Sequence, residues 1–415
     1  MSGSSESTAL ITNDAIVLGL LISLLAVVFY TSSSQKPYFK KFYRIFPMLL
    51  MCYFLPSLLT TFGVVDPGQS NLYYVASRYF LPASLVLLTL SIDLKEIFKL
   101  GPKALIMFFT GTVGVVFGGP LAILITSLFN PELVSGDVWR GFTTVAGSWI
   151  GGGANQAAMY EIFEVKDDLF SIMITVDVIV AEIWMAFLLL GVGRHREIDK
   201  KFKADASAVD ELQHKMHEFS QRHARIPTLT DITVILAFGL GATGVAHFLS
   251  AQIVPFIEAN APFLERFSLT SGFFWLIVIA TTIGVILSFT KIRKYEGAGA
   301  SRIGSLFIYF LVATIGMKMN ITEIFSNPGL FLVGGIWMAI HVGLLLLVGK
   351  LIRAPYFFLA VGSKANIGGA ASAPVVAAAF HPSLAPVGVL LAVLGYALGT
   401  YGAWLSGIMM QAAAP

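Results

Sequence analysis

The stretches GSWIGGGANQAAM, residues 147–159, and GSKANIGGAASAP, residues 362–374, decide how this chain folds. Each lies within a long apolar segment. Each also contains consecutive glycines, which lower helix stability by about 1 kcal/mol apiece relative to alanine. Helix breaks are therefore predicted in both stretches, at Gly151, Gly152 and Gly153 and at Gly368 and Gly369.

The composition places these stretches in a membrane. Of the 415 residues, 56% are hydrophobic and only 12% are charged, and the mean hydropathy is +0.79. Soluble domains carry roughly a quarter charged residues, so a soluble enzyme is excluded. The net charge of +3 is small, and the basic residues are confined to a few loops, which bears on topology rather than on nucleic-acid binding. The polar N-terminus lacks a basic region, so we expect the first apolar helix to be retained.

Twelve apolar stretches are long enough to be membrane helices, because a bilayer core needs about 20 apolar residues per helix. They cover roughly residues 13–30, 43–64, 74–92, 104–128, 141–160, 169–193, 231–250, 271–290, 303–317, 328–350, 355–379 and 384–409. The predicted organisation is a polar N-terminus (1–12), a first transmembrane repeat (13–193), a polar linker (194–230), a second transmembrane repeat (231–409) and a C-terminal tail (410–415). In the linker, apolar residues at helical spacing predict a short amphipathic helix: Val209, Leu212, Met216 and Phe219.

The two halves repeat one another. Ala-Ser-Arg at 76–78 recurs at 300–302, Glu-Ile-Phe at 96–98 recurs at 323–325, and the two glycine-rich stretches follow in the same order, at offsets of about 215 to 227 residues. Basic residues belong on the inner side of a membrane. In the first half, the basic residues precede the second and fourth stretches, which puts the N-terminus outside. In the second half, they precede the third and fifth stretches. The halves are therefore predicted to be inverted repeats.

This count leaves one conflict. Six full crossings per half would make the linker start outside and end inside, although its basic residues favour the inside. Either one apolar stretch does not fully cross, or residues 253–267 make an extra partial crossing.

Polar side chains gather beside the glycines. Broken helices expose carbonyls, which suit Na⁺, and helix N-termini, which suit an anionic group. Close packing of small residues would explain the glycines and alanines but not the amides and the lysine among them. We therefore predict a solute site at Asn155, Gln156, Ser363, Lys364 and Asn366, and a Na⁺ site at Thr144, Ser148, Asn155, Asp177, Asn366 and Ser372.

Asp177 and Lys364 are the key charges in this hypothesis. Asp177 lies near the middle of its span, where a charge is costly unless it is partnered, so it is interpreted as a cation or proton site; the alternative is a structural carboxylate paired with Lys364 or a hydroxyl. Lys364 could hold a solute carboxylate or neutralise Asp177. We interpret His341 as a buried hydrogen-bonding residue rather than a proton relay. HExxH and CxxC motifs do not occur, and Ser363 and Lys364 are poorly placed for a dyad, so we do not expect an enzyme.

At the glycine-rich stretches, GSWIGGGANQAAM and GSKANIGGAASAPVVAAAF, and at the Ala-Ser-Arg repeats, the chain resembles the YjcL-like membrane protein family, a domain of unknown function. The similarity of organisation runs from about Asp14 to Gly407. That family is distantly similar to bile acid–sodium symporters, sodium–glutamate symporters and sodium–proton antiporters. The resemblance implies a scaffold and a core that moves as an elevator, with two discontinuous helices crossing near residues 151–155 and 366–369. The antiporters' paired carboxylates are not matched, because Val178 follows Asp177, which favours symport.

The sequence thus predicts an all-α polytopic membrane protein, in the bacterial plasma (inner) membrane. We expect a sodium-coupled symporter of a small, anionic or zwitterionic organic solute such as an amino acid, short peptide or organic acid. The alternatives are a Na⁺/H⁺ or other cation antiporter and a membrane-embedded enzyme. H⁺ could replace Na⁺ as the coupling ion. By analogy with elevator transporters, we expect a homodimer among membrane lipids.

Overall fold

The computed structural model describes residues 10–415 except for 47, 91, 93, 206, 208, 210–225, 268, 319–326, 382 and 383. These residues form helices throughout, and the β-structure among them is a single isolated bridge between Ile11 and Val65. The predicted all-α class is confirmed. The predicted amphipathic helix at 209–219 falls almost wholly outside the described residues.

The helices of the first half lie largely within the apolar stretches of the sequence, apart from short helices at residues 37–45, 94–99 and 195–202. They are α1 (Asp14–Ser32), α2 (Pro37–Ile45), α3 (Met48–Thr61), α4 (Leu72–Val75), the π-helix η2 (Ala76–Phe80), α5 (Leu81–Leu90), α6 (Leu94–Lys99), α7 (Pro102–Ser127), α8 (Val138–Gly151), α9 (Gly153–Ile162), α10 (Asp167–Val192) and α11 (His195–Phe202), with 3-10 turns η1 (Pro67–Gln69) and η3 (Pro131–Val134).

The second half follows the same rule. Its elements are α13 (Leu229–Asn260), η4 (Pro262–Phe267), α14 (Gly272–Ser288), η5 (Lys291–Ala298), α15 (Ala300–Lys318), α16 (Gly329–Leu351), α17 (Tyr356–Asn366), α18 (Gly369–Phe380) and α19 (Ala385–Ala413). Residues 253–260 continue α13 through Pro255 rather than starting a separate crossing.

Within the described part of the chain, seven helices are by themselves long and apolar enough to cross a membrane: α1, α7, α10, α13, α15, α16 and α19. Helix α14 also passes this test together with η5, from which it is bent by 96°. The chain is therefore an integral, multi-pass membrane protein.

The first glycine-rich stretch forms a helical hairpin. Helix α8 ends at Gly151 and α9 begins at Gly153. The guanidinium of Arg140, near the start of α8, donates to the carbonyl of Phe163, just beyond the end of α9, at 2.7 Å. A Cβ atom on Gly147 would lie 2.5 Å from the carbonyl oxygen of Asn155. Helix α9 therefore runs back along α8, and residues 138–162 are called the first hairpin.

The second glycine-rich stretch has the same form. Helix α17 ends at Asn366 and α18 begins at Gly369. The ring of Phe380, the last residue of α18, lies 5.2 Å from the ring of Phe357 and 6.0 Å from that of Tyr356, at the start of α17. Residues 356–380 are called the second hairpin.

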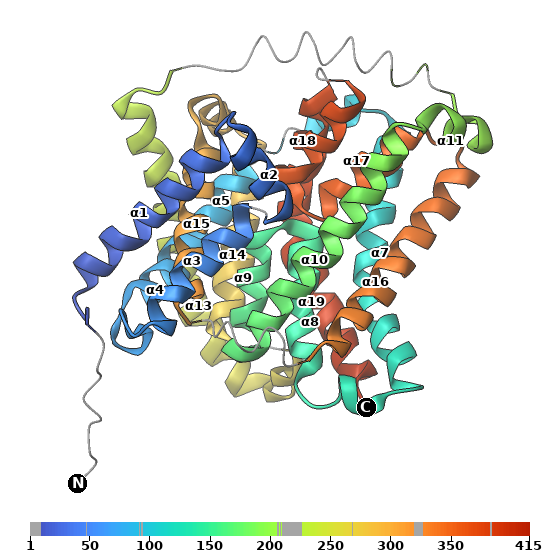
Figure 1. Cartoon of the computed structure of the whole chain (residues 1–415). Coiled ribbons are helices and arrows are strands. Elements are labelled where there is room, and N and C mark those ends of the chain that lie inside the picture. Colours follow the sequence, from blue (N-terminus) through green and yellow to red (C-terminus); the bar gives the residue numbers. More distant parts are fainter. Residues whose placement is uncertain are drawn as a thin grey trace.

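The sequence has twelve apolar stretches and leaves open whether each of them crosses fully; in the structure, the stretches 141–160 and 355–379 form hairpins. Apolar length does not distinguish the two cases, because a glycine-broken stretch of about 25 residues has the same hydropathy whether it crosses or turns back. Figure 1 shows α2, α11 and α18 at one end of the molecule and α4 and the C-terminus at the opposite end. Basic residues mark the first of these ends, including Lys40 and Lys41 on α2 and Lys200 and Lys201 on α11.

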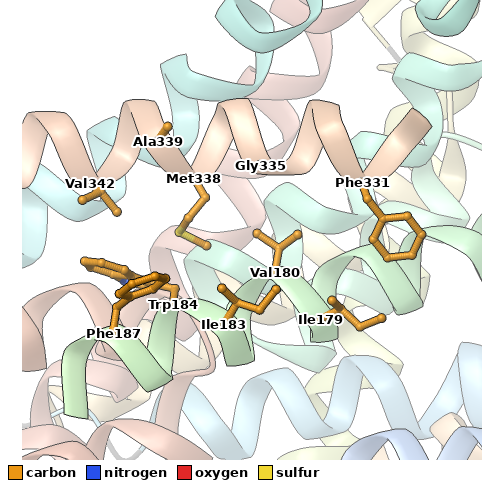
Figure 2. Close-up of a pocket in the computed structure, with 10 residues that line it drawn as sticks. All are labelled: Ile179, Val180, Ile183, Trp184, Phe187, Phe331, Gly335, Met338, Ala339 and Val342. Atoms are coloured by element: carbon orange, nitrogen blue, oxygen red, sulfur yellow. The ribbon is translucent and has the colours of Figure 1, made fainter. Parts of the chain in front are cut away.

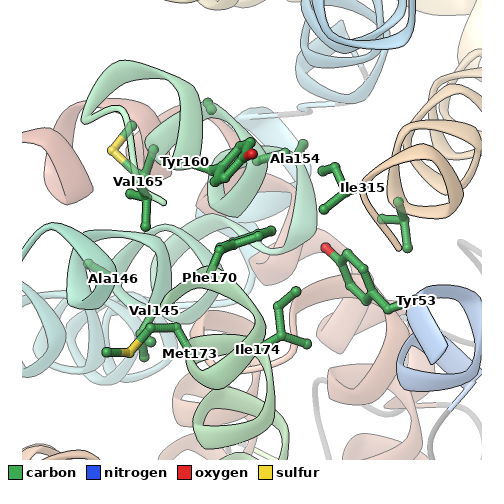
Figure 3. Packing of buried hydrophobic residues seen from close by; sticks show 14 of the residues in the cluster. Tyr53, Val145, Ala146, Ala154, Tyr160, Val165, Phe170, Met173, Ile174 and Ile315 are labelled. Atoms are coloured by element: carbon green, nitrogen blue, oxygen red, sulfur yellow. The ribbon is translucent and has the colours of Figure 1, made fainter. Parts of the chain in front are cut away.

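Helices α10 and α16 leave an apolar groove of about 500 Å³ between them, lined from both sides by aliphatic and aromatic side chains (Figure 2). On the other side of α10, the first hairpin packs into the protein core. Figure 3 shows Val145 of α8, Ala154 of α9 and Phe170 of α10 gathered with Tyr53 of α3 and Ile315 of α15.

Each hairpin has its own apolar core. The buried residues of the second hairpin cluster with those of α7 and α19, among them Met107, Phe108 and Leu391. Two smaller clusters join α5, α13 and α14, for example through Val86, Ala246 and Leu276. Helices α5 and α14 also contribute to the cluster of the first hairpin, for example through Leu85 and Ile277, so this group packs against the hairpin as well as within itself.

Candidate functional site

The tips of both hairpins meet helix α19. Gly152 has φ +75° and Gly368 has φ +101°, values that side-chain-bearing residues rarely adopt, so glycine permits each turn. A Cβ atom on Gly395 of α19 would lie 2.5 Å from the carbonyl oxygen of Ile150 and 3.6 Å from that of Ala365. The last turns of α8 and α17 therefore approach one another across a single glycine of α19.

Asp177 of α10 is held by the first hairpin. The indole Nε1 of Trp149 donates to its Oδ1 at 2.7 Å, and the amide Nε2 of Gln156 donates to its Oδ2 at 3.0 Å. The Ser148 side chain interacts with the same carboxyl group. The hydroxyl of Tyr53 donates to Gln156 Oε1 at 3.4 Å. N–H donors thus bond to both carboxyl oxygens, and such bonds offset part of the cost of burying a carboxylate.

Asn155 joins the first hairpin to α19. Its Nδ2 donates to the carbonyls of Gly151, at 3.0 Å, and Tyr396, at 3.3 Å. The hydroxyl of Thr400 donates to its Oδ1 at 2.7 Å. A Cβ atom on Gly399 would lie 2.5 Å from this Nδ2, so glycine in α19 makes room for the amide.

Asn366 joins the second hairpin to α7 by the same pattern. Its Nδ2 donates to the carbonyls of Gly362 and Phe108, both at 3.0 Å, and the hydroxyl of Thr112 donates to its Oδ1 at 2.8 Å. The asparagine of each hairpin therefore makes the same three bonds. It donates to the carbonyl four residues before it in its own hairpin. On a neighbouring continuous helix, it donates to a second carbonyl and accepts from a threonine hydroxyl four residues further along.

Lys364 of the second hairpin points to α10. Its side chain is fully buried, and Nζ donates to the carbonyl of Ala181 at 3.1 Å. The carboxylates of Glu182 and Asp177 attract it across the site. The buried lysine of α17 thus lies against the stretch of α10 that carries the buried aspartate, which keeps the local net charge low.

Ser363 lies on the side of the second hairpin that faces α16. The indole Nε1 of Trp184 donates to its Oγ at 2.8 Å, and His341 Nε2 lies 2.8 Å from the same oxygen. His341 Nδ1 lies 3.1 Å from the carbonyl of Gly111. His341 is buried and hydrogen-bonded, as the sequence interpretation had it, and Ser363 bonds to it rather than to Lys364.

The structure does not bring the six residues of the predicted Na⁺ site into one set. Ser148 and Asp177 lie together, but Asn155 and Asn366 belong to separate networks. The Thr144 hydroxyl donates to the carbonyl of its own helix at Gly141, and Ser372 lies beside the Gly368 turn. Of the predicted solute site, Gln156, Ser363 and Lys364 all contact α10, but Ser363 does so through Trp184 and is also bonded to His341 of α16.

Several contributors were not predicted as site residues. They are Tyr53, Thr112, Trp149, Tyr396 and Thr400, which lie on α3, α7, α8 and α19. The available signal was the repeated glycine and threonine in otherwise apolar spans, as at Gly111–Thr112 and Gly399–Thr400.

Ion pairs hold the open end of the first hairpin. Arg78 of η2, the arginine of the first Ala-Ser-Arg repeat, pairs with Glu161 of α9 at 2.9 Å. Lys318, at the end of α15, pairs with Asp167 of α10 at 3.1 Å and donates to the Tyr160 hydroxyl at 2.8 Å. The first hairpin is thereby tied to two elements of the surrounding helices.

Comparison with known proteins agrees with this picture of a membrane protein. The chain is 26% identical over 370 residues to the "Uncharacterized membrane protein YjcL" of Bacillus subtilis (strain 168), and the match covers 85% of this chain and 88% of that protein. Residues 19–413 match the family described as "Protein of unknown function (DUF819)". The chain therefore belongs to the DUF819 family of membrane proteins.

Proposed function

We propose that this protein is a secondary active transporter that moves a small anionic or zwitterionic organic solute, such as an amino acid, short peptide or organic acid, together with Na⁺. The observation that carries the proposal is the meeting of two helical hairpins at Gly395, beside the buried charges Asp177 and Lys364. Discontinuous helices at membrane depth line transport sites because their ends offer carbonyls to cations and N–H groups to anions.

The topology supports this reading. If the two hairpins return to the side from which they start, ten of the twelve apolar stretches remain as crossings. With the N-terminus outside, the 194–230 linker then lies wholly inside, which removes the conflict posed by its basic residues. The first hairpin enters from outside and the second from inside. This is the arrangement expected of inverted repeats, each consisting of five crossings and one hairpin.

The charges of the site support coupling of Na⁺ to an anionic solute. A buried charge without a partner is far more costly than a buried pair. Na⁺ bound at the Asp177 carboxylate would neutralise that charge and leave the positive charge of Lys364 without its counter-charge. An anion bound at Lys364 would likewise leave the negative charge of Asp177 without its counter-charge. Binding both ligands together restores neutrality, so each favours the other. Carboxylate, hydroxyl and carbonyl oxygens, as offered by Asp177, Ser148 and the hairpin tips, are suitable ligands for a hard cation.

The proposed alternating access is based on the packing of the helices. Asn155, Asp177, Lys364 and Asn366 are all buried, so this conformation is closed around the site. In the proposed elevator mechanism, the hairpins with α7, α10, α16 and α19 would move as the core, and α5, α13 and α14, which share two smaller apolar clusters, would belong to the scaffold. A homodimer held by the scaffold is proposed on the same grounds.

A cation antiporter is the second candidate, because Asp177 alone could exchange Na⁺ for H⁺. The two candidates differ in whether a solute binds. A thermal-shift screen of amino acids, short peptides and organic acids on the purified protein, in Na⁺ and in K⁺, tests this directly. The symporter is expected to be stabilised by an anionic or zwitterionic solute more strongly in Na⁺ than in K⁺. Stabilisation by Na⁺ with no responding solute would favour the antiporter.

A further inference from the structure

The groove between α10 and α16 faces outward from the protein. It is lined by Ile179, Val180, Ile183, Trp184 and Phe187 from α10 and by Phe331, Gly335, Met338, Ala339 and Val342 from α16 (Figure 2). Ile183 is 56% exposed and Phe187 62% exposed. In a membrane protein, such side chains contact lipid, so the groove offers a binding surface to an acyl chain.

A second, basic pocket adjoins the groove. It has a volume of about 440 Å³ and is lined by Phe187, Leu190, Gly191, Arg194, Glu197, Ile198 and Lys201. Phe187 lines both spaces. Residues 197, 198 and 201 share one face of α11, and Arg194, the residue that precedes this helix, lines the same pocket. Two cations and one carboxylate give this pocket a net charge of +1, which suits a singly charged anion.

The groove and the basic pocket together are about as long as one leaflet of a bilayer is thick. Fifteen residues separate Ile179 from Arg194, which corresponds to about 22 Å along a helix. One leaflet with its headgroups is also about 20 to 22 Å thick. The basic pocket lies at the α11 end of the molecule, which carries the basic loops and is therefore expected to face the cytoplasm (Figure 1).

We propose that the groove and the basic pocket together bind one anionic phospholipid of the inner leaflet. An acyl chain would occupy the α10–α16 groove, and the phosphodiester would lie between Arg194 and Lys201. Basic pockets beside membrane helices on the cytoplasmic side are suited to anionic headgroups. Glu197 on the same face disfavours headgroups of higher negative charge and makes a monoanionic lipid such as phosphatidylglycerol the expected ligand.

This lipid would support the second hairpin. Trp184, in the wall of the groove, donates to Ser363 of α17 at 2.8 Å. Asp199 of α11 accepts the backbone N–H of Tyr356, at the start of α17, at 2.6 Å. Both spaces are therefore lined by elements that hold this hairpin. The inference does not depend on what the protein transports.

The test is native mass spectrometry of the purified full-length protein with phosphatidylglycerol and, separately, phosphatidylcholine. The wild type is expected to retain phosphatidylglycerol more strongly. Replacing both cations (Arg194→Ala with Lys201→Ala) should weaken binding of phosphatidylglycerol about thirtyfold and remove its preference over phosphatidylcholine. The matched control is Arg196→Ala with Lys200→Ala, on another face of the same helix, which should retain the preference.

A second pair of variants tests the groove. Gly335 and Gly343 both lie on α16 with nothing within 4 Å of an added Cβ atom, but only Gly335 lines the groove. Gly335→Leu should reduce retention of both lipids, whereas Gly343→Leu should not. Equal retention of the two lipids by the wild type would overturn the proposal. The proposal would also be overturned if Gly335→Leu retained both lipids as well as the wild type does. The same holds if the control pair of substitutions lost phosphatidylglycerol as strongly as the pocket pair.

Discussion

Trp149 and Lys364 occupy corresponding positions in the two glycine-rich stretches, and both reach helix α10 within one turn. Trp149 donates to the Asp177 carboxylate at 2.7 Å, and Lys364 donates to the carbonyl of Ala181, four residues further on, at 3.1 Å. One hairpin thus binds the anionic group on α10, and the other places a cation beside it. The two halves differ in charge at the point where they meet the same helix.

Replacement of Asp177 by asparagine should abolish stabilisation by Na⁺. The wild type is expected to melt at a higher temperature in Na⁺ than in K⁺, because a ligand at a hundred times its Kd stabilises a protein by about 2.7 kcal/mol. Asp177→Asn removes the charge that would bind the cation. Glu182→Gln is the control: it removes a half-buried carboxylate that also attracts Lys364 but does not belong to the Trp149–Gln156 network. A Na⁺ response that survives in Asp177→Asn would place the cation elsewhere.

The two hairpin asparagines should each be needed for stability. Asn366→Ala deletes three buried hydrogen bonds and leaves the Thr112 hydroxyl only its longer bond to the Phe108 carbonyl, at 3.3 Å; each deleted bond contributes about 0.5 to 1.5 kcal/mol. Asn155→Ala should behave alike through Thr400. Unfolding in denaturant measures both. Thr112→Ser, which keeps the hydroxyl, serves as the control, and an Asn366→Ala protein as stable as this control would show that the network contributes little.

Any side chain in place of the glycines at the hairpin turns, Gly152 and Gly368, should destabilise the protein. At Gly152, with φ +75°, an added Cβ atom would meet its nearest neighbour at 3.8 Å, so Gly152→Ala probes backbone strain alone, at about 1 to 3 kcal/mol. Gly368→Ala should cost more, because its Cβ would also lie 2.1 Å from Ser372 Oγ. Gly153→Ala, next to the turn but in helix α9, is the control and should be neutral or stabilising. Melting temperatures of the three variants test this order; Gly152→Ala matching Gly153→Ala would contradict it.

The sequence predicted the helical elements and the positions of the breaks, but not that the broken stretches turn back. Apolar length and glycine content are local properties, and they are the same for a crossing and a hairpin. The contacts that make a hairpin, such as Arg140 with Phe163, join residues 23 apart and do not follow from periodicity. Only the basic linker indicated that not every stretch crosses, because its positive charge was inconsistent with six crossings per half.

The candidate site was predictable in part for a similar reason. Buried polar residues stand out in apolar spans, so Asn155, Asp177, Lys364 and Asn366 could be chosen from the sequence alone. Their partners could not, because Thr400 lies 245 residues from Asn155 and Thr112 lies 254 residues from Asn366. The amides that looked free to bind a ligand prove to be bonded to α19 and α7. A repeated motif says which residues correspond, but not which neighbouring helix each one meets.

The Arg78–Glu161 ion pair should couple the first hairpin to η2. The two side chains are 29% and 12% exposed, so the pair is partly shielded from solvent. A double-mutant cycle of Arg78→Gln and Glu161→Gln should give an interaction energy of about 1 kcal/mol or more, above the range of fully exposed pairs. Lys99→Gln with Glu96→Gln breaks a more exposed pair and provides the comparison. An interaction energy near zero for Arg78 and Glu161 would mean that the hairpin is held by its apolar contacts alone.

Uptake into proteoliposomes tests the proposed transport most directly. A solute that stabilises the purified protein in Na⁺ would be supplied outside vesicles containing the wild type, Lys364→Met or Asp177→Asn, under an inward gradient of Na⁺, of K⁺ or of H⁺. The account predicts accumulation above the outside concentration by the wild type under the Na⁺ gradient only, and none by either variant. Accumulation that ignores the Na⁺ gradient, or that persists in Asp177→Asn, would contradict it.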